Sequence, residues 1–205
     1  MKRVINLDNW NRKEHFKFFS ALDDPFWGIT TTVDFTSIYQ QSKNMEVSFF
    51  LYSVHFLLKC INATTAFKLR IENGEVVEYD KINISPTIGR EDGTFGFGFF
   101  EYDTDLSLFI ENAEKEIHRV KNSTGLSFSK DTARADVIRY SALPWFAFSE
   151  MKHAGSIQTG DSIPKISTGK LIQEKKKLLL PISISVHHGL VDGRNVAEFI
   201  QNVKD

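Results

Sequence analysis

Hydrophobic residues along the chain change their spacing several times, from a helical period to the alternation of strands and back. The clearest helical pattern covers residues 48–64, where apolar side chains recur at about i, i+3, i+4 and i+7. Residues 9–20, residues 104–120 and a segment that begins near Asn195 have similar but weaker spacing. We therefore predict helices in these segments.

Segments rich in β-branched and aromatic residues lie between and after these helices, which is typical of strands. Asn73-Gly74 and Asp92-Gly93 mark turns within this region. The predicted strands cover residues 67–71, 76–79, 83–88, 94–100, 137–143, 165–173 and 178–187. Because no Pro/Gly/Ser-rich stretch and no internal repeat divides the chain, we expect one α/β domain over residues 1–205.

Charge and composition exclude several classes of protein. The 25 Lys and Arg against 26 Asp and Glu give a formal net charge of −1, so the chain has no general attraction to phosphate backbones and we expect no nucleic-acid partner. The 205 residues are 41% hydrophobic and include 18 Phe, which is enough for a packed core. The single cysteine, Cys60, cannot form an internal disulfide or a multi-cysteine zinc site.

No segment has the pattern of a membrane span or a secretion signal. The most apolar stretches, residues 49–61 and 178–186, are shorter than the ~20 residues that a spanning helix needs. Residues 1–12 lack the apolar region of a signal peptide. We therefore expect a soluble, cytoplasmic protein with no membrane partner.

The densest group of reactive side chains follows the predicted strand 178–187, where His187-His188 precedes Asp192-Gly193. A histidine held by its own or a nearby carbonyl in a partly dry site stays neutral near pH 7 and can take a proton from a hydroxyl. Strand alternation places His188 on the face of Ile182, Ile184 and Val186, and His187 on the face of Ser183 and Ser185. The two imidazole rings should therefore point in opposite directions.

Two other interpretations of this motif stay open. Both histidines could simply end a strand, with Asp192 capping the next helix and Asn195 and Glu198 forming a capping-box-like pair. A metal site at His187, His188 and Asp192 is less favoured, because adjacent histidines on a strand diverge. We expect no bound metal.

The motif at 187–193, preceded by residues 178–186, resembles the active-site region of the chloramphenicol acetyltransferase family. Residues 9–16, 141–145 and 164–170 resemble other segments of that family in the same order. The resemblance implies a two-layer α/β sandwich with a large mixed sheet, of the type found in CoA-dependent acyltransferases. It also implies a homotrimer with active sites at the subunit interfaces.

The resemblance assigns the catalytic roles as follows. His188 matches the general base, and Asp192 matches an aspartate that pairs with an arginine, here Arg12, to hold the turn. Ser141 matches a serine that donates a hydrogen bond to the tetrahedral oxyanion and lies beside CoA. Ser167 replaces a threonine near CoA, and Lys170 matches a basic residue close to the phosphates of CoA.

Several residues at the positions of the acceptor pocket depart from the family pattern. Phe19 replaces a tyrosine, Phe97 replaces a small residue, and Arg139 lies near an expected asparagine. His153 and Lys165 lie near positions that are usually apolar, while Phe95 matches the pocket wall. Buried charges weaken apolar binding unless they are paired or turned outward.

The resemblance implies transfer of an acetyl group from acetyl-CoA, as co-substrate, directly to a hydroxyl of a small molecule, with chloramphenicol as the default acceptor. It implies no permanently bound cofactor. The alternatives are a different small hydroxylated acceptor, a non-catalytic binder of the same fold, and, less favoured, the core of a dihydrolipoyl acyltransferase.

Overall fold

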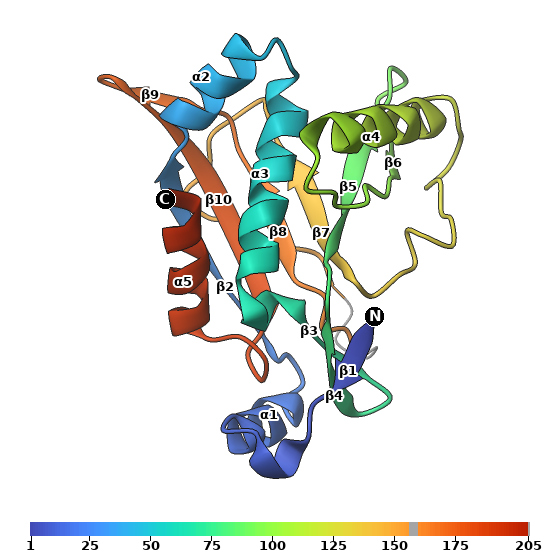
Figure 1. Cartoon of the computed structure of the whole chain (residues 1–205), viewed down its shortest axis with the longest axis vertical. Coiled ribbons are helices and arrows are strands. Elements are labelled where there is room, and N and C mark those ends of the chain that lie inside the picture. Colours follow the sequence, from blue (N-terminus) through green and yellow to red (C-terminus); the bar gives the residue numbers. More distant parts are fainter. Residues whose placement is uncertain (156–159, 205) are drawn as a thin grey trace.

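One large sheet is built from strands of both halves of the sequence (Figure 1). The computed structural model describes residues 1–155 and 160–204. The strands of this sheet are β2 (Phe26–Asp34), β5 (Asn83–Gly89), β6 (Phe95–Phe97), β7 (Val137–Ala142), β8 (Lys165–Thr168), β9 (Ile172–Glu174) and β10 (Lys177–His187). Their order is β2-β10-β8-β7-β5-β6, with β9 paired to β10. Because β7 runs parallel to β5 and β8 while β10 runs antiparallel to its neighbours, the sheet is mixed, as expected.

A smaller antiparallel sheet extends from one end of the large one. Its order is β1-β4-β3, from β1 (Lys2–Val4), β4 (Glu75–Tyr79) and β3 (Leu69–Glu72). Short 3-10 turns at Leu7–Asn9 and Thr65–Lys68 connect it to the neighbouring helices.

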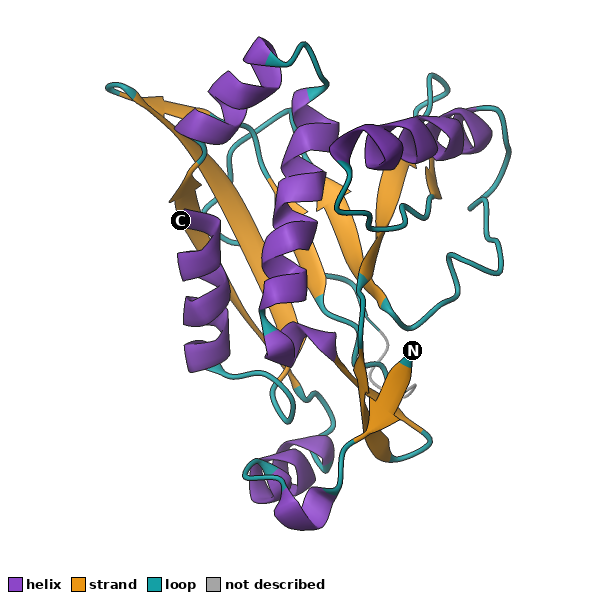
Figure 2. Ribbon diagram, in the orientation of Figure 1, coloured by secondary structure: helices purple, strands orange, loops and turns teal. Residues whose placement is uncertain are grey.

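Helices α2 (Thr36–Asn44), α3 (Phe49–Ala63), α4 (Leu106–Lys121) and α5 (Gly193–Lys204) lie on one face of the large sheet (Figure 2). The core forms where α3 packs on alternate residues of the strands, among them Ile182, Ile184 and Val186 of β10. Helix α1 (Lys13–Ser20) lies apart, at the end of the sheet where β10 ends (Figure 1). The two-layer sandwich is confirmed.

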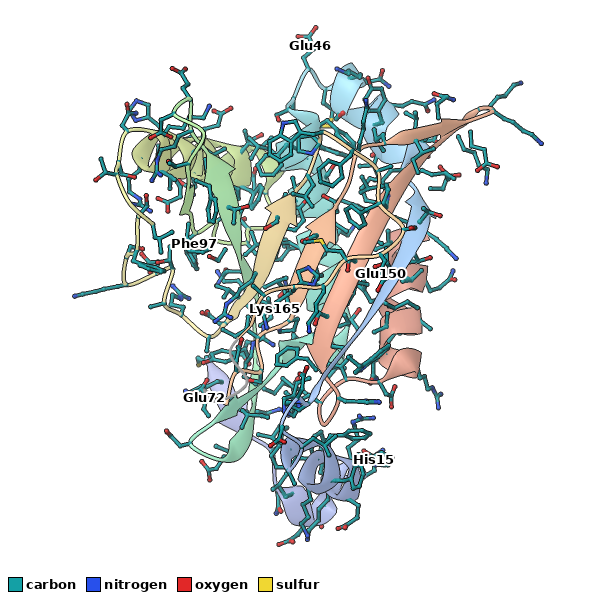
Figure 3. The ribbon with its side chains drawn as sticks, turned by 180° about the vertical axis from the view of Figure 1, so that it is seen from behind. His15, Glu46, Glu72, Phe97, Glu150 and Lys165 are labelled. Atoms are coloured by element: carbon teal, nitrogen blue, oxygen red, sulfur yellow. The ribbon has the colours of Figure 1, made fainter. Side chains whose placement is uncertain are left out.

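The opposite face of the sheet, here called the back face, is unusually polar. It presents Ser183, Ser185 and His187 of β10, which alternate with the core residues of that strand. Residues 143–155, which follow β7, cross this face (Figure 3), and Ser183 Oγ donates there to the carbonyl of Met151 at 3.4 Å. The active-site candidates on β7 and β8 therefore lie under this segment rather than under the helices.

Some predicted elements differ from the structure. The helix predicted at 9–20 begins only at Lys13, because Trp10 is extended. The strand predicted at 165–173 is wrong as one element, since residues 169–171 separate β8 from β9 and the N–H of Lys170 donates to the carbonyl of Phe146, outside the sheet. The strand predicted at 94–100 is reduced to β6. Strands β1 and β2 and helix α2 were not predicted.

In the described part of the chain, each helix is too short or too polar to cross a bilayer.

Candidate active site

His188 lies in the turn after β10, and its backbone is bonded on both sides. Its N–H donates to the carbonyl of Pro25 at 2.8 Å, and its own carbonyl accepts from Arg12 Nη2 at 3.2 Å. The imidazole stacks on Phe19, with ring centroids 3.9 Å apart and planes at 23°, and Trp27 lies 5.3 Å away. Backbone contacts and aromatic packing together fix the orientation of this half-buried ring.

The way the ring is held corrects one expectation. Sequence analysis expected a carbonyl to fix the imidazole, but His188 Nδ1 is buried without a hydrogen-bond partner among the described residues. The carbonyl of His188 accepts from Arg12 instead, and Phe19 holds the ring. The two rings do diverge: His187 lines a cavity on the back face, whereas His188 packs against α1 rather than joining the core.

Asp192 holds the turn with both of its carboxylate oxygens. Arg12 Nη1 donates to Oδ2 at 2.5 Å, so the ion pair expected from the resemblance is present. Oδ1 accepts from the N–H groups of Arg194 and Asn195, and Asn195 Oδ1 accepts from the N–H of Asp192. The reciprocal capping pair is therefore Asp192 with Asn195, and the pair predicted between Asn195 and Glu198 is wrong.

The protonation state of Asp192 follows from these contacts. Partial burial alone would raise the pKa of its carboxyl group. The Arg12 guanidinium and the N–H groups of α5 outweigh this effect and bring the pKa below its usual value. Asp192 is thus a stable carboxylate at neutral pH, suited to orienting the turn rather than to exchanging protons.

His187 is buried on the back face and is 3% exposed. Burial lowers its pKa to about 4, although the Asp161 carboxylate partly opposes this. Its Nδ1 accepts from the N–H of Gly189 at 3.2 Å, so the neutral ring carries its proton on Nε2. Among the described residues, no group of three or more His, Cys, Asp or Glu side chains could hold a metal ion.

A cavity of about 860 Å³ lies on the back face between β2, β8, β10 and residues 149–155. His153 and Lys165, two of the residues at predicted pocket positions, both line it. Phe19, Phe95 and Phe97 are not among its described lining residues, so the five predicted pocket residues do not share one cavity within a single chain.

Lys165 is almost fully buried beside this cavity. Its Nζ lies 3.2 Å from the Asp161 carboxylate and 3.9 Å from the ring centroid of Phe26. Arg139 Nη1 donates to the same carboxylate at 2.7 Å. Burial favours the neutral acid, but the N–H of Ile163 and the two cations bring the pKa of Asp161 below its usual value.

Ser167 and His153 form a partly buried pair on the same face of the sheet as Lys165. His153 Nε2 lies 3.0 Å from Ser167 Oγ, and Ser167 is fully buried. Burial, and then the charge of Lys165, lower the pKa of His153, which keeps this imidazole neutral at pH 7.

Ser141 lies far from His188 within the chain. Its Oγ accepts from Thr87 Oγ1 at 3.2 Å. Ser141 is paired with Ser167, which is paired with Ser183 of β10, and His188 comes five residues after Ser183. At ~3.3 Å per residue, the two side chains are separated by roughly 16 Å along the strands.

The remaining predicted residues lie at the Ser141 end of the sheet. Phe97 is paired with Thr87, and Phe95 packs edge-on against Phe97. Lys170 is exposed just after β8. Figure 3 shows Lys165 between Phe97 at this end and His15 of α1 at the other.

The chain matches one known protein family over almost its full length. The family model described as "Chloramphenicol acetyltransferase" matches residues 2–204, almost the entire chain. The chain belongs to the chloramphenicol acetyltransferase family. It is therefore an enzyme of the acyltransferase class.

Relatives from this family match at low identity but full length. Chloramphenicol acetyltransferase 3 of Escherichia coli is 27% identical over 202 residues, covering 98% of this chain and 94% of the relative. Chloramphenicol acetyltransferase of Clostridioides difficile is 28% identical over 205 residues, with 98% and 93% covered.

Similarity to solved structures supports the assignment to this family. A chloramphenicol acetyltransferase superimposes with a TM-score of 0.92 at 30% identity, covering 100% of this chain and 99% of the other. A dihydrolipoamide acetyltransferase of Azotobacter vinelandii gives a TM-score of 0.71 at 14% identity, covering 94% and 84%, and so shares the fold.

Two residues that shape the site, Asp161 and Trp27, were not predicted from the sequence. Asp161 was not considered, although it joins Arg139 to Lys165. Trp27 was also missed, and its indole N–H donates to the carbonyl of Val191 in the turn that carries His188. Asp161 stands four residues before Lys165, but outside a helix that spacing has no structural meaning, so no local signal identified it.

Proposed function

We propose that this protein is an acetyl-CoA-dependent O-acetyltransferase that acts on a hydroxyl group of a small molecule, with chloramphenicol as the default acceptor. The observation that carries the proposal is the fixed His188 imidazole, stacked on Phe19 in a turn held by Arg12 and Asp192. A general base works best when its geometry is set before the substrate arrives.

His188 takes the proton of the acceptor hydroxyl at Nε2, because Nδ1 is buried against the protein. The hydroxyl oxygen then attacks the thioester carbonyl carbon, and a carbon–oxygen bond forms. When the tetrahedral intermediate collapses, the carbon–sulfur bond breaks and the proton passes from His188 to the departing thiolate of CoA. No acyl-enzyme forms, and Asp192 stays ionised throughout.

Ser141 stabilises the oxyanion of that intermediate, but it must come from another copy of the chain. The roughly 16 Å between Ser141 and His188 along the strands is too far for one chain to place both on one carbon. A contact between the His188 end of one copy and the Ser141 end of the next is heterologous, and such contacts form a closed ring when the rotation from copy to copy adds up to a full turn. We assign a homotrimer, the assembly that the resemblance implies.

Exposed aromatic residues at the Ser141 end support this assembly. Large apolar side chains that remain in contact with water include Phe95, Phe128, Trp145 and Phe146. Phe128 stacks on Phe97, and Trp145 and Phe146 follow shortly after β7. Apolar surface concentrated in one region favours contact with another protein.

Ser167 and Lys170 are assigned to the CoA side of the site. Lys170 is exposed close to β8, where its ammonium can meet a phosphate, and Ser167 lies across from Ser141. Acetyl-CoA is then a co-substrate, and no cofactor is permanently bound. We place the enzyme in the cytoplasm, since its co-substrate is an intracellular metabolite and Cys60 is a free thiol.

The test is the release of CoA thiol from acetyl-CoA with chloramphenicol, followed by a panel of small alcohols. We expect turnover by the wild type and a loss of about 10²- to 10⁴-fold in kcat for His188→Ala. His15→Ala serves as the matched control, because His15 is an exposed histidine on α1. It should retain wild-type activity.

An unchanged rate for His188→Ala would overturn the mechanism. Binding of acetyl-CoA and acceptor without any release of thiol would identify a non-catalytic binder. Turnover only on alcohols other than chloramphenicol would retain the chemistry and change the acceptor.

A further inference from the structure

The turn that carries His188 is also held from the side of the sheet where β2 begins. The His188 N–H donates to the carbonyl of Pro25 at 2.8 Å, and the indole N–H of Trp27 donates to the carbonyl of Val191 at 3.0 Å. These two bonds come from residues only two positions apart in the chain, and they reach the first and the last residue of the turn 188–191. The start of β2 therefore fixes both ends of this turn.

The carbonyl of Val191 depends on Trp27 for its hydrogen bond. Val191 is 2% exposed, and its N–H is already used in a bond to the carbonyl of His187. Within the described ranges of the chain, the indole N–H is the only donor to the Val191 carbonyl. A buried carbonyl that loses its donor keeps the full cost of its desolvation. Loss of the indole N–H would therefore loosen this end of the turn.

The Trp27 ring also contacts the imidazole of His188. The two ring centroids are 5.3 Å apart, with planes at 42°, and the centroid of Phe19 lies 3.9 Å from that of the imidazole. His188 Nδ1 is buried without a hydrogen-bond partner among the described residues, so no bond at this nitrogen fixes the rotation of the ring. Aromatic contacts from two separate elements, α1 and β2, restrict it instead.

Two simpler roles are also open to a tryptophan at this position. Trp27 packs against the hydrophobic core, and it lines the cavity on the back face, where an acceptor could meet it. Either role needs only the apolar surface of the indole. Neither explains why the N–H is directed at the turn of His188 while the ring contacts the imidazole of the same turn.

We propose that Trp27 is a positioning residue for His188, whose indole N–H fixes the turn and whose ring fixes the imidazole before substrates bind. This inference rests on the proposed function, since it adds a residue to that same site. Arg12 and Asp192 hold the turn from α1 and α5, and Trp27 holds it from β2. A displacement of about 1 Å in a reacting group can cost about 10²-fold in rate, so the second support matters for catalysis.

The experiment compares two substitutions of Trp27 by the release of CoA thiol, with chloramphenicol or the best alcohol of the panel as acceptor. Trp27→Phe keeps an aromatic ring but removes the N–H, and kcat should fall about 5- to 10-fold. Trp27→Leu removes both contacts, and kcat should fall about 10²-fold. The KM values for acetyl-CoA and the acceptor should stay within about threefold. A rise in KM with an unchanged kcat would identify Trp27 as a substrate contact and overturn the proposal.

A double variant separates positioning from a general effect on folding. In the His188→Ala background, Trp27→Phe should cause no further loss of the residual rate, because no imidazole remains to be positioned. An equal further loss in that background would overturn the proposal. Trp10→Phe is the matched control, since it makes the same chemical change at a tryptophan that packs on Phe16, and it should keep the wild-type kcat. Urea unfolding establishes the folded fraction of each variant.

NMR of the histidine side chains in ¹⁵N-labelled protein provides a readout besides activity. The ring signals of His188 are those that disappear in His188→Ala. They should form one set in the wild type and in Trp10→Phe, and should shift or split into several sets in Trp27→Phe. Trp27→Phe carries this test even if Trp27→Leu fails to fold.

The two proposals can fail separately. Turnover that depends on His188, with a wild-type kcat and unchanged ring signals in Trp27→Phe, would leave the acetyltransferase proposal standing and reject the role of Trp27. Altered His188 ring signals in Trp27→Phe, in a protein that releases no thiol with any acceptor, would support the positioning by Trp27 and reject the proposed function.

Discussion

The two ends of the large sheet hold their functional side chains in different ways. At the α1 end, the His188 backbone is bonded on both sides, its ring stacks on Phe19, and the Arg12–Asp192 pair closes the turn. At the other end, Ser141 has a single hydroxyl partner, Thr87, close to exposed aromatic residues. The chain therefore orients His188, the proposed base, by itself, whereas Ser141, the proposed oxyanion donor, lies at the end that we propose is completed by a second copy.

Mixing two inactive variants gives the largest expected effect. His188→Ala should lose about 10²- to 10⁴-fold in kcat, and Ser141→Ala about 10²- to 10³-fold. Refolding equal amounts together should restore about a quarter of wild-type activity, because that share of sites in a random ring pairs an intact histidine with an intact serine. The rate of CoA-thiol release measures this recovery.

The control for this experiment is the same mixture without unfolding and refolding, which should remain inactive. A refolded mixture that is no more active than its components would show that both residues serve a site within one chain. The proposed division between the two ends would then be wrong.

The pH dependence of stability that is due to His187 is the next largest expected effect. Burial lowers the pKa of His187 from 6.5 to about 4, so between these pH values the unfolded chain binds more protons than the folded one. Stability is therefore full above pH 6.5 and falls as the pH decreases. The loss due to His187 should be about 2 kcal/mol between pH 7 and pH 5.

His187→Asn removes the titrating group, so its stability should depend less on pH over this range. Urea unfolding at fixed protein concentration, at pH 7 and pH 5, measures the difference. Equal pH dependence in the variant and the wild type would mean that His187 is accessible to protons in the folded state.

Substitutions of Asp192 have the smallest expected effect, and they distinguish its two contacts, the ion pair with Arg12 and the cap of α5. Asp192→Asn keeps an oxygen that can cap α5 but loses the ion pair with Arg12, while Asp192→Ala loses both. Asp192→Ala should be less stable than Asp192→Asn by about 1 kcal/mol. Both variants should have a reduced kcat, because each loosens the turn that carries His188.

Thermal or urea unfolding of the two Asp192 variants measures how much the cap contributes to stability. Their rates of CoA-thiol release measure how much the turn contributes to activity. If Asp192→Asn kept full activity, the ion pair would have no part in positioning His188.

Local patterns in the sequence identified much of the fold. The helical spacing of residues 48–64 matches α3 (Phe49–Ala63), and the alternation in residues 178–187 matches β10. Strand β2 was missed, because four of its residues are exposed and its pattern does not alternate cleanly. Helix α2 was missed because only Ile38 and Ser42 of its residues are buried.

Local patterns in the sequence predicted less of the candidate site than of the fold. Arg12 and Asp192 stand 180 residues apart, and only the resemblance brought them together. The same resemblance named Lys165 and Arg139 but not Asp161, the carboxylate that both of these cations contact. Contacts between distant segments leave no periodic signal in the sequence.

The amino-acid sequence alone was enough to identify the elements with strong periodicity, the motif of His188 and Asp192, and the family resemblance, because these depend on residues close together or on ordered matches along the chain. The folded structure was needed to show that Lys165 lies buried beside a cavity, that Phe19 stacks on the His188 ring, and that Ser141 lies at the other end of the sheet. These facts depend on strand order and register. Both are set by packing of the whole sheet, since any one strand could pair with several neighbours.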